Sequence, residues 1–263
     1  MRIATWNVNS IRSRIGRVEA FLQRHDVDVL CLQETKCRDD QFPLMVLTEL
    51  GYEVAHHGLN QWNGVAIASR VGLEDVRIGF DGMPGFGEPL APEARALGAT
   101  CGGVQLWSLY VPNGRALGDP HLAYKLDWLT QLQVAAQGWL KEDDRARIAL
   151  CGDWNIAPQD DDVWDMTVFE GATHVSEPER AAFRAIVDTG YADVVRPHAP
   201  GPGVYTYWDY KQLSFPKRKG MRIDFVLGSP AFTERVEAAM IDREERKGKG
   251  PSDHAPVIVD LTD

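Results

Sequence analysis

Side chains that could bind a metal ion or a phosphate stand at the ends of several predicted strands. Asn7 ends the first strand, Glu34 follows the second, Tyr110 closes another, and Asp153 and Asn155 follow a fourth. Taken singly, such residues are usually helix caps, turn formers or core aromatics. A sheet collects its strand ends along a few edges, however, so residues far apart in the sequence can meet in one cleft.

A second group of polar residues lies near the C-terminus. Asp224 opens a late strand after a basic run, and Asp253-His254 precedes the last strand. Glu34, Asp253 and Asn7 offer hard oxygen ligands, which suit Mg²⁺ or Mn²⁺. A second carboxylate such as Asp224 could orient the histidine. With no serine elbow and no zinc-ligand spacing, the whole set favours metal-assisted phosphoester hydrolysis.

The hydrophobic pattern predicts the elements that must position these residues. Strands are expected over residues 2–8, 28–33, 64–69, 104–111, 147–151, 223–227 and 256–261, and helices over 10–24, 121–141 and 178–187. Interleaved strands and helices predict an α/β or α+β class. The Gly- and Pro-rich residues 81–98 are expected to form a long loop. No linker or repeat divides the chain, so we expect one domain over residues 1–263.

Composition narrows the class of protein. The chain of 263 residues is 44% hydrophobic and 25% charged, which is typical of globular proteins. No segment is apolar enough for a membrane span or a signal peptide, so a cytoplasmic protein is expected. The cysteines, which form no Cys-x-x-Cys pair, are expected to be buried thiols. No heptad pattern is present, so a monomer is expected. The four cysteines are Cys31, Cys37, Cys101 and Cys151.

The net charge of −10 argues against a non-specific nucleic-acid binder. It is compatible with an enzyme that cuts nucleic acid, because carboxylates gathered around a cation add negative charge locally. Two basic groups could still form a binding face, although solvated surface charge is the alternative interpretation. They are residues 217–222 and the set Arg243, Arg246, Lys247 and Lys249.

Six short motifs, taken in order, resemble those of the exonuclease III family of DNA-repair nucleases, within the endonuclease/exonuclease/phosphatase superfamily. They are Thr5-Trp6-Asn7-Val8-Asn9, Leu32-Gln33-Glu34-Thr35-Lys36, Tyr110-Val111-Pro112-Asn113-Gly114, Gly152-Asp153-Trp154-Asn155-Ile156-Ala157-Pro158, Arg222-Ile223-Asp224 and Ser252-Asp253-His254-Ala255-Pro256. The resemblance implies a four-layer α/β sandwich, with two packed mixed sheets flanked by helices. It also implies a Mg²⁺-dependent enzyme of base excision repair, with Mn²⁺ as an alternative ion. Its partner would be duplex DNA, cleaved 5′ to abasic sites, with further activity on blocked 3′ ends or 3′→5′ digestion.

The resemblance also implies roles for the polar residues. Glu34 would be the principal metal ligand, with Asn7 and Asp253 nearby. Asp153 would orient or deprotonate the attacking water, and Asn155 would position that water or the phosphate. A second metal position, if one exists, would use Asp153 and Asn155.

The histidine and the tyrosine would act on the phosphate. His254, held by Asp224, would bind it and stabilise the transition state, and Tyr110 would contact it. Either Asp153 or His254 could be the base. We favour Asp153, which is expected to keep a low pKa, with His254 as the electrostatic donor.

Further residues are expected to contact the DNA. Tyr207, Met221 and Ile223 match the wall of the sugar pocket in relatives. Binding through phosphate contacts should weaken with salt. The predicted DNA contacts are Asn9, Lys36, Asn113, Arg115, Lys125, Lys217, Arg218 and Arg222.

Other activities occur in the same superfamily, including general endonucleases, sphingomyelinases and inositol polyphosphate phosphatases. A catalytically silent binding module on the same fold is a further alternative. The run from Gly152 to Pro158 favours the repair branch, and every matching motif position is filled, which disfavours a silent module.

Overall fold

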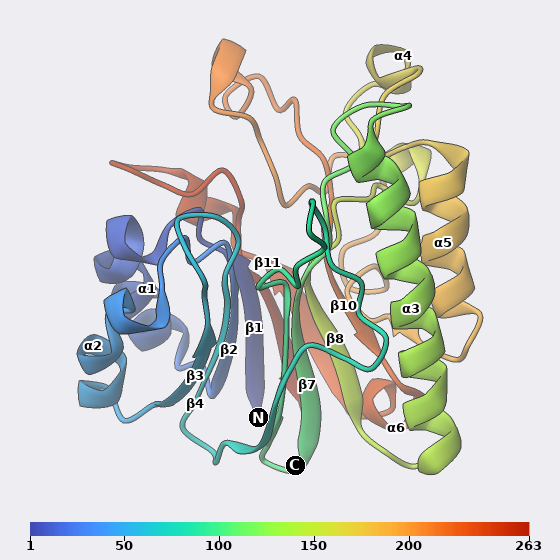
Figure 1. Cartoon of the computed structure of the whole chain (residues 1–263). Helices are drawn as coiled ribbons and strands as arrows, with labels where there is room; N and C mark the ends of the chain where they lie inside the picture. Colours follow the sequence, from blue (N-terminus) through green and yellow to red (C-terminus); the bar gives the residue numbers. More distant parts are fainter. Residues whose placement is uncertain (263) are drawn as a thin grey trace.

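Two mixed β-sheets packed face to face form the centre of the molecule in the computed structural model, which describes residues 1–262 (Figure 1). In spatial order, the first sheet consists of β11 (Val236–Ile241), β12 (Val257–Leu261), β1 (Arg2–Asn7), β2 (Val29–Gln33), β4 (Val65–Ser69) and β3 (Glu53–His57). The second consists of β5 (Glu74–Ile78), β6 (Ala96–Cys101), β7 (Val104–Tyr110), β8 (Ile148–Asp153), β10 (Asp224–Gly228) and β9 (Ala192–Asp193).

Helices cover the outer faces of both sheets. On the first sheet lie α1 (Ile11–His25) and α2 (Leu44–Glu49), and on the second lie α3 (Pro120–Glu142) and α5 (Glu177–Val187) (Figure 1). The short helices α4 (Met166–Phe169) and α6 (Pro230–Thr233) lie in connections, as do 3₁₀ turns at Asp39–Gln41, Asp160–Asp162, Lys211–Leu213 and Arg243–Arg246. The predicted four-layer α/β sandwich is confirmed. Among residues 1–262, no helix has the length and apolar character needed to cross a membrane.

Three apolar layers hold the sandwich together. Side chains of both sheets, such as Val29 and Leu106, form the central layer between them. Phe21 packs α1 onto the first sheet, and Trp128 packs α3 onto the second. The central strands are buried on both faces and therefore read as continuous apolar runs.

Each sheet contains one parallel strand pair, and the two pairs determine where the site forms. β1 and β2 are parallel and joined by α1, and β7 and β8 are parallel and joined by α3. Parallel neighbours end at the same edge of a sheet. Across the interface β1 approaches β8 and β2 approaches β7, so the four carboxyl ends converge. Both termini lie at the opposite end of the molecule (Figure 1).

The predicted strands and helices are all present, with boundaries that shift by no more than about two residues. The missed elements are mostly short or exposed, and every residue of β5 is exposed, so its pattern contains no buried face. The expected loop over residues 81–98 is shorter at its end, because β6 begins at Ala96. All four cysteines are buried and free, as expected.

At Gly152 the backbone of β8 lies so close to β7 that there is no room for a side chain. Its φ is 150°, and an added Cβ would lie 1.9 Å from the carbonyl oxygen of Leu109. We expect Gly152→Ala to lower the free energy of unfolding by more than about 2 kcal/mol, measured by urea denaturation.

Gly138→Ala is the matched control, because no atom lies within 4 Å of the corresponding Cβ on α3. It should raise stability by about 0.5–1 kcal/mol. Equal effects of the two substitutions would show that the close approach of β7 and β8 is not important for stability.

Candidate active site

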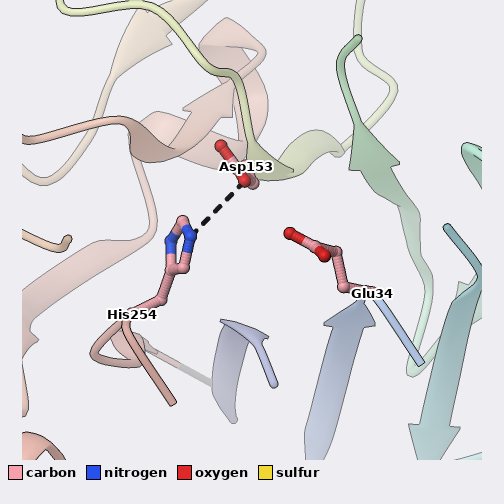
Figure 2. Close-up of side chains that lie close together, drawn as sticks. All are labelled: Glu34, Asp153 and His254. Carbon is pink, nitrogen blue, oxygen red and sulfur yellow. Dashed lines mark ion pairs between the residues drawn. The ribbon is translucent and has the colours of Figure 1, made fainter. Parts of the chain in front are cut away.

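Three side chains that could share a metal ion meet where the carboxyl ends of the strands converge. Glu34 follows β2, Asp153 ends β8 and His254 precedes β12 (Figure 2). One potential ligand atom from each lies within 4.8 Å of those of the other two. The sequence separates these residues widely, and the structure brings them together as predicted.

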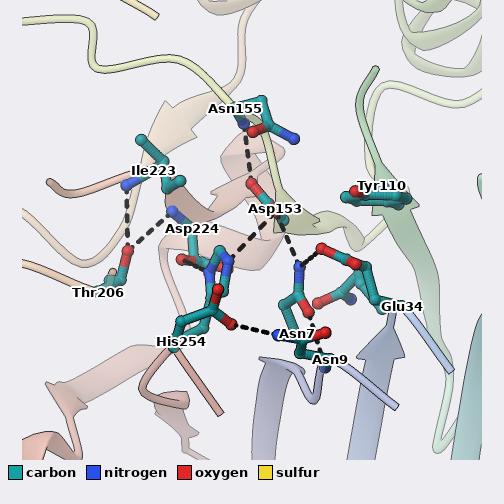
Figure 3. A network of polar contacts seen from close by, with 12 residues as sticks. Asn7, Asn9, Glu34, Tyr110, Asp153, Asn155, Thr206, Ile223, Asp224 and His254 are labelled. Carbon is teal, nitrogen blue, oxygen red and sulfur yellow. Dashed lines mark hydrogen bonds and ion pairs between the residues drawn. The ribbon is translucent and has the colours of Figure 1, made fainter. Parts of the chain in front are cut away.

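Asn7 bridges the two carboxylates. Its Nδ2 donates to Glu34 Oε1 at 2.8 Å and to Asp153 Oδ2 at 2.9 Å (Figure 3). Its Oδ1 accepts a hydrogen bond from the backbone N–H of Asn9 at 3.0 Å. The opposite amide orientation would place the oxygen against both carboxylates. In this arrangement Asn7 is a donor that holds the two carboxylates together, which fits an indirect contribution to the metal site, and direct ligation by Asn7 stays a prediction.

Lys36 and Asn9, which were predicted as DNA contacts, extend this polar network. The ammonium of Lys36 lies 2.7 Å from Glu34 Oε2 and donates to Asn9 Oδ1 at 2.5 Å. Asn9 in turn donates to Asp253 Oδ1 at 3.0 Å. Burial disfavours the charged form of Glu34, but Lys36 and Asn7 outweigh burial and lower its pKa. Glu34 is thus kept ionised and ready to bind a cation. Asp253 lies outside the three-residue cluster, which fits an indirect role.

His254 is held between two aspartates. Its Nδ1 lies 2.8 Å from Asp224 Oδ2, and its Nε2 lies 3.7 Å from Asp153 Oδ2. Thr206 Oγ1 fixes the start of β10 by accepting hydrogen bonds from the backbone N–H groups of Ile223 and Asp224 (Figure 3). Burial alone would lower the pKa of His254, but Asp224 and Asp153 outweigh it and raise the pKa to about 10. The ring is therefore an imidazolium at neutral pH and acts as a donor.

Asp153 has the opposite character. Burial, reinforced by the charges of Asp224 and Glu34 and opposed by His254, raises its pKa to about 7. The low pKa was expected for this aspartate beside amides and a metal ion; without the cation the pKa is raised, because the carboxyl is almost fully buried. In the absence of a cation, the carboxyl of Asp153 can therefore gain or lose a proton near neutral pH.

Asn155 is fixed beside Asp153. Its backbone N–H donates to Asp153 Oδ1 at 2.9 Å, and its Nδ2 donates to the carbonyl of Val111 at 3.0 Å. Its Oδ1 accepts from Asn113 Nδ2 at 3.1 Å and lies 3.3 Å from His174 Nε2. The sequence reasoning missed His174, which lines the same cavity, because a lone histidine outside any motif gave no signal.

The three residues predicted to wall the sugar pocket line one cavity of about 180 Å³ together with Glu34, Asp153 and His254. Tyr207, Met221 and Ile223 form part of its wall, and the ring of Tyr207 lies 5.0 Å from that of His254. Tyr110 lines the same cavity as Glu34. Burial and the negative charge of Glu34 raise the pKa of the Tyr110 hydroxyl well above its ordinary value. Tyr110 therefore keeps its proton and can donate it in a hydrogen bond.

Two predicted DNA contacts are wrong because their side chains are buried. The ammonium of Lys125 lies 2.5 Å from Glu179 Oε1 and donates to the carbonyl of Asn155 at 2.6 Å. Arg222 contacts Asp162 Oδ1 at 2.6 Å and Asp193 Oδ2 at 2.5 Å. Both cations are used inside the protein.

Other predicted DNA contacts remain available on the surface. Arg115, Lys217 and Arg218 are exposed. In the second basic group, Arg246 is buried and donates to the carbonyl of Trp208, so this group is only partly available as a binding face.

The donor set fits a divalent cation. Glu34 and Asp153 present carboxylate oxygens close together, which is the chemistry that hard cations prefer. Protonated His254 would not ligate the ion. The two carboxylates would therefore hold it.

A sandwich of two mixed sheets, with a carboxylate pair and an aspartate-held histidine at one edge, defines a class of metal-dependent phosphoesterases. The model of the Endonuclease/Exonuclease/phosphatase family matches residues 4–254. The chain belongs to this family, within its exonuclease III group.

Named relatives and solved structures support this assignment. Exodeoxyribonuclease III of Haemophilus influenzae is 30% identical, with 98% of each chain covered. The structure of a 3′ phosphatase from Neisseria bound to a product DNA hairpin has a TM-score of 0.94 and 35% identity over the whole of both chains. An AP endonuclease from Archaeoglobus fulgidus has a TM-score of 0.93 and 35% identity, again over both whole chains.

The buried pair of Lys125 and Glu179 generates a test of stability. Lys125→Met would leave Glu179 charged and unpaired beneath the site, and should cost about 3–5 kcal/mol in the free energy of unfolding. Lys141→Met, at an exposed position of the same helix, should change it by less than about 0.5 kcal/mol. Urea denaturation measures both. Normal stability of Lys125→Met with salt-dependent loss of DNA binding would instead restore Lys125 as a DNA contact.

Proposed function

We propose that the chain is a metal-dependent DNA-repair nuclease that cleaves the phosphodiester 5′ to abasic sites in duplex DNA and also acts at 3′ ends, in base excision repair. The observation that carries the proposal is the meeting of Glu34, Asp153 and His254 in a small cavity. Relatives named exodeoxyribonuclease III, AP endonuclease and 3′ phosphatase support both activities.

The residues divide the reaction between them. Asp153 accepts the proton of the attacking water, and Asn155 holds Asp153 and the phosphate in place. The imidazolium of His254 and the hydroxyl of Tyr110 donate to phosphate oxygens, on which negative charge grows in the transition state. A Mg²⁺ ion held by Glu34 and Asp153, or Mn²⁺ in its place, would supply Lewis-acid stabilisation of that charge.

Selection of the abasic site follows from the size of the cavity. At about 180 Å³ it is smaller than the roughly 300–1,000 Å³ that is typical of pockets for larger ligands. A sugar without a base costs less to turn out of the helix than a normal nucleotide. Tyr207, Met221 and Ile223 would contact this sugar and exclude a nucleotide that keeps its base.

We further propose that residues 1–263 act as one domain and as a monomer. The apolar layer between the sheets takes side chains from both halves of the chain, such as Val29 and Val226, so the two sheets share one central core. Since the substrate would be chromosomal DNA, we place the enzyme in the cytoplasm.

Metal dependence is the first test. Incubation with Mg²⁺ should cleave a duplex with one internal abasic site and trim a duplex with a 3′-phosphate, and gel analysis should show both products. EDTA should abolish both reactions, and excess Mg²⁺ should restore them. Glu34→Ala should lose at least about 100-fold in kcat/KM, because charge stabilisation in the transition state is removed.

The outcomes distinguish the alternatives. Turnover of inositol phosphates or sphingomyelin, with none of DNA, would place the chain in another branch of the family. Absence of any turnover with intact DNA binding would indicate a silent module. Cleavage of one DNA substrate without the other would divide the two proposed activities.

The base assignment is tested by removing single carboxylates. Asp153→Asn should lower kcat by about 10²–10⁴-fold, since an amide cannot accept the proton of water. Asp224→Asn, which touches the site only through His254, should cost about 10–100-fold. Steady-state kinetics on the abasic duplex measures both. If Asp153→Asn keeps most of its activity, Asp153 is not the base.

A further inference from the structure

A second and larger hollow lies beside the catalytic cavity. It has a volume of about 680 Å³ and shares Tyr110 and Asn113 with that cavity, so the two lie next to each other. Its walls come from three segments: residues 59–63 between β3 and β4, residues 86–95 before β6, and residues 113–121 after β7. The long loop singled out in the sequence therefore forms one wall of this hollow, here called the Trp62 groove.

The floor of the Trp62 groove is a fixed polar surface. Glu93 accepts hydrogen bonds from Asn63 Nδ2 at 3.1 Å and from Arg95 Nε at 2.6 Å. Arg95 is only 4% exposed, and its guanidinium lies 4.8 Å from the centre of the Tyr110 ring. The charge of Glu93 is thus neutralised by Arg95, and the floor offers hydrogen bonds without repelling an anion strongly.

The rim of the groove has a different character. Trp62 is 63% exposed, and among residues 1–262 its indole stacks on no other aromatic ring. An Asx turn, in which Asn60 Oδ1 accepts the Trp62 backbone N–H at 2.8 Å, shapes the loop that presents it. Across the groove, Arg115 is exposed and forms no ion pair with the described residues. A free aromatic face and a free cation therefore line the same opening.

We propose that the Trp62 groove binds one unpaired nucleobase of the substrate strand, next to the phosphate that is cleaved, and this rests on the proposed function. The base stacks on the indole of Trp62, the polar floor bonds its edge, and Arg115 contacts the adjoining phosphate. Stacking on an aromatic side chain serves every base and needs no sequence preference. Because the groove adjoins the catalytic cavity at Tyr110 and Asn113, this nucleotide lies beside the scissile bond.

The chemistry of the groove favours a nucleotide over an apolar peptide segment. Asn60, Asn63, Glu93 and Arg95 all line it, and an apolar side chain would leave these groups without water or partners. A base has both an apolar face and a polar edge. The groove therefore matches a base in shape and in hydrogen bonding.

Binding without turnover gives the most direct test. In an Asp153→Asn background, duplexes carry the fluorescent base 2-aminopurine at each position within two nucleotides of an abasic site or of a 3′-phosphate end. At one of these positions, binding should change the fluorescence through contact with Trp62. Trp62→Ala should remove that change, and Trp62→Phe should restore part of it. Val134→Ala, at a position 60% exposed on α3, is the control.

A thermodynamic cycle separates stacking from a general effect on the fold. Trp62→Ala should weaken DNA binding on the order of tenfold. When the base at the responding position is replaced by an abasic spacer, the same substitution should have almost no effect. An equal loss with and without that base, or no loss with either, would overturn the proposal.

Failure of the proposed function would look different. In that case the unmodified enzyme would not cleave either DNA substrate in Mg²⁺, whereas failure of the Trp62 groove leaves cleavage intact and removes only the dependence on the base. The proposal would also be contradicted if an apolar peptide bound in the groove while DNA binding caused no change in 2-aminopurine fluorescence.

Discussion

Like charges gathered in a buried cleft are the constraint on which the rest of the site depends. Buried Asp153 and Asp224 and half-buried Glu34 approach one another where little water screens them, so repulsion between the carboxylates is strong. Lys36 and the imidazolium of His254 offset part of this repulsion. With two positive and three negative side chains, the cleft has a net negative charge. A divalent cation would neutralise this charge, and the same charge would hold the cation in place. In the protein without a cation, burial and the same imbalance together raise the pKa of Asp153.

The topology makes this gathering of charge feasible. Each sheet has a parallel pair linked by a helix, so Asn7 and Glu34 emerge together at one edge, as do Tyr110 and Asp153. The sheets pack with these edges aligned, and the apolar layer beneath them excludes water from one side of the cleft. The free energy gained by burying the apolar layer thus offsets the unfavourable free energy of placing several carboxylates together at the strand ends. The left-handed backbone of Glu34, with φ of 52°, and of Asn155, with φ of 50°, shows that the chain turns sharply as it leaves the sheets.

Sequence reasoning succeeded where local pattern and global packing agree. Buried strands such as β2 and β8 are continuous apolar runs that end in a polar residue, so both the strand and its functional end were predictable. It failed where tertiary context decides the outcome. Lys125 on α3 carries no mark that distinguishes a buried ion pair from a surface cation, because its partner Glu179 lies far along the chain. His174 was missed for a similar reason, since only the folded loop brings it to Asn155.

The protein has a net charge of −10, and DNA is also strongly negative. Attraction between them must therefore come from contacts at the binding site and not from the overall charge. Several cations are consumed inside the protein, as Arg222 is between Asp162 and Asp193, so they add nothing to the external field. Each cation used inside the protein is one fewer phosphate contact, so less affinity comes from release of counterions. Uncharged contacts then carry a larger share of the affinity, and stacking on an aromatic side chain is one such contact for a base that has left the duplex. An exposed indole beside the catalytic cavity is therefore more useful to an acidic nuclease than to a basic one, which already holds its substrate through charge.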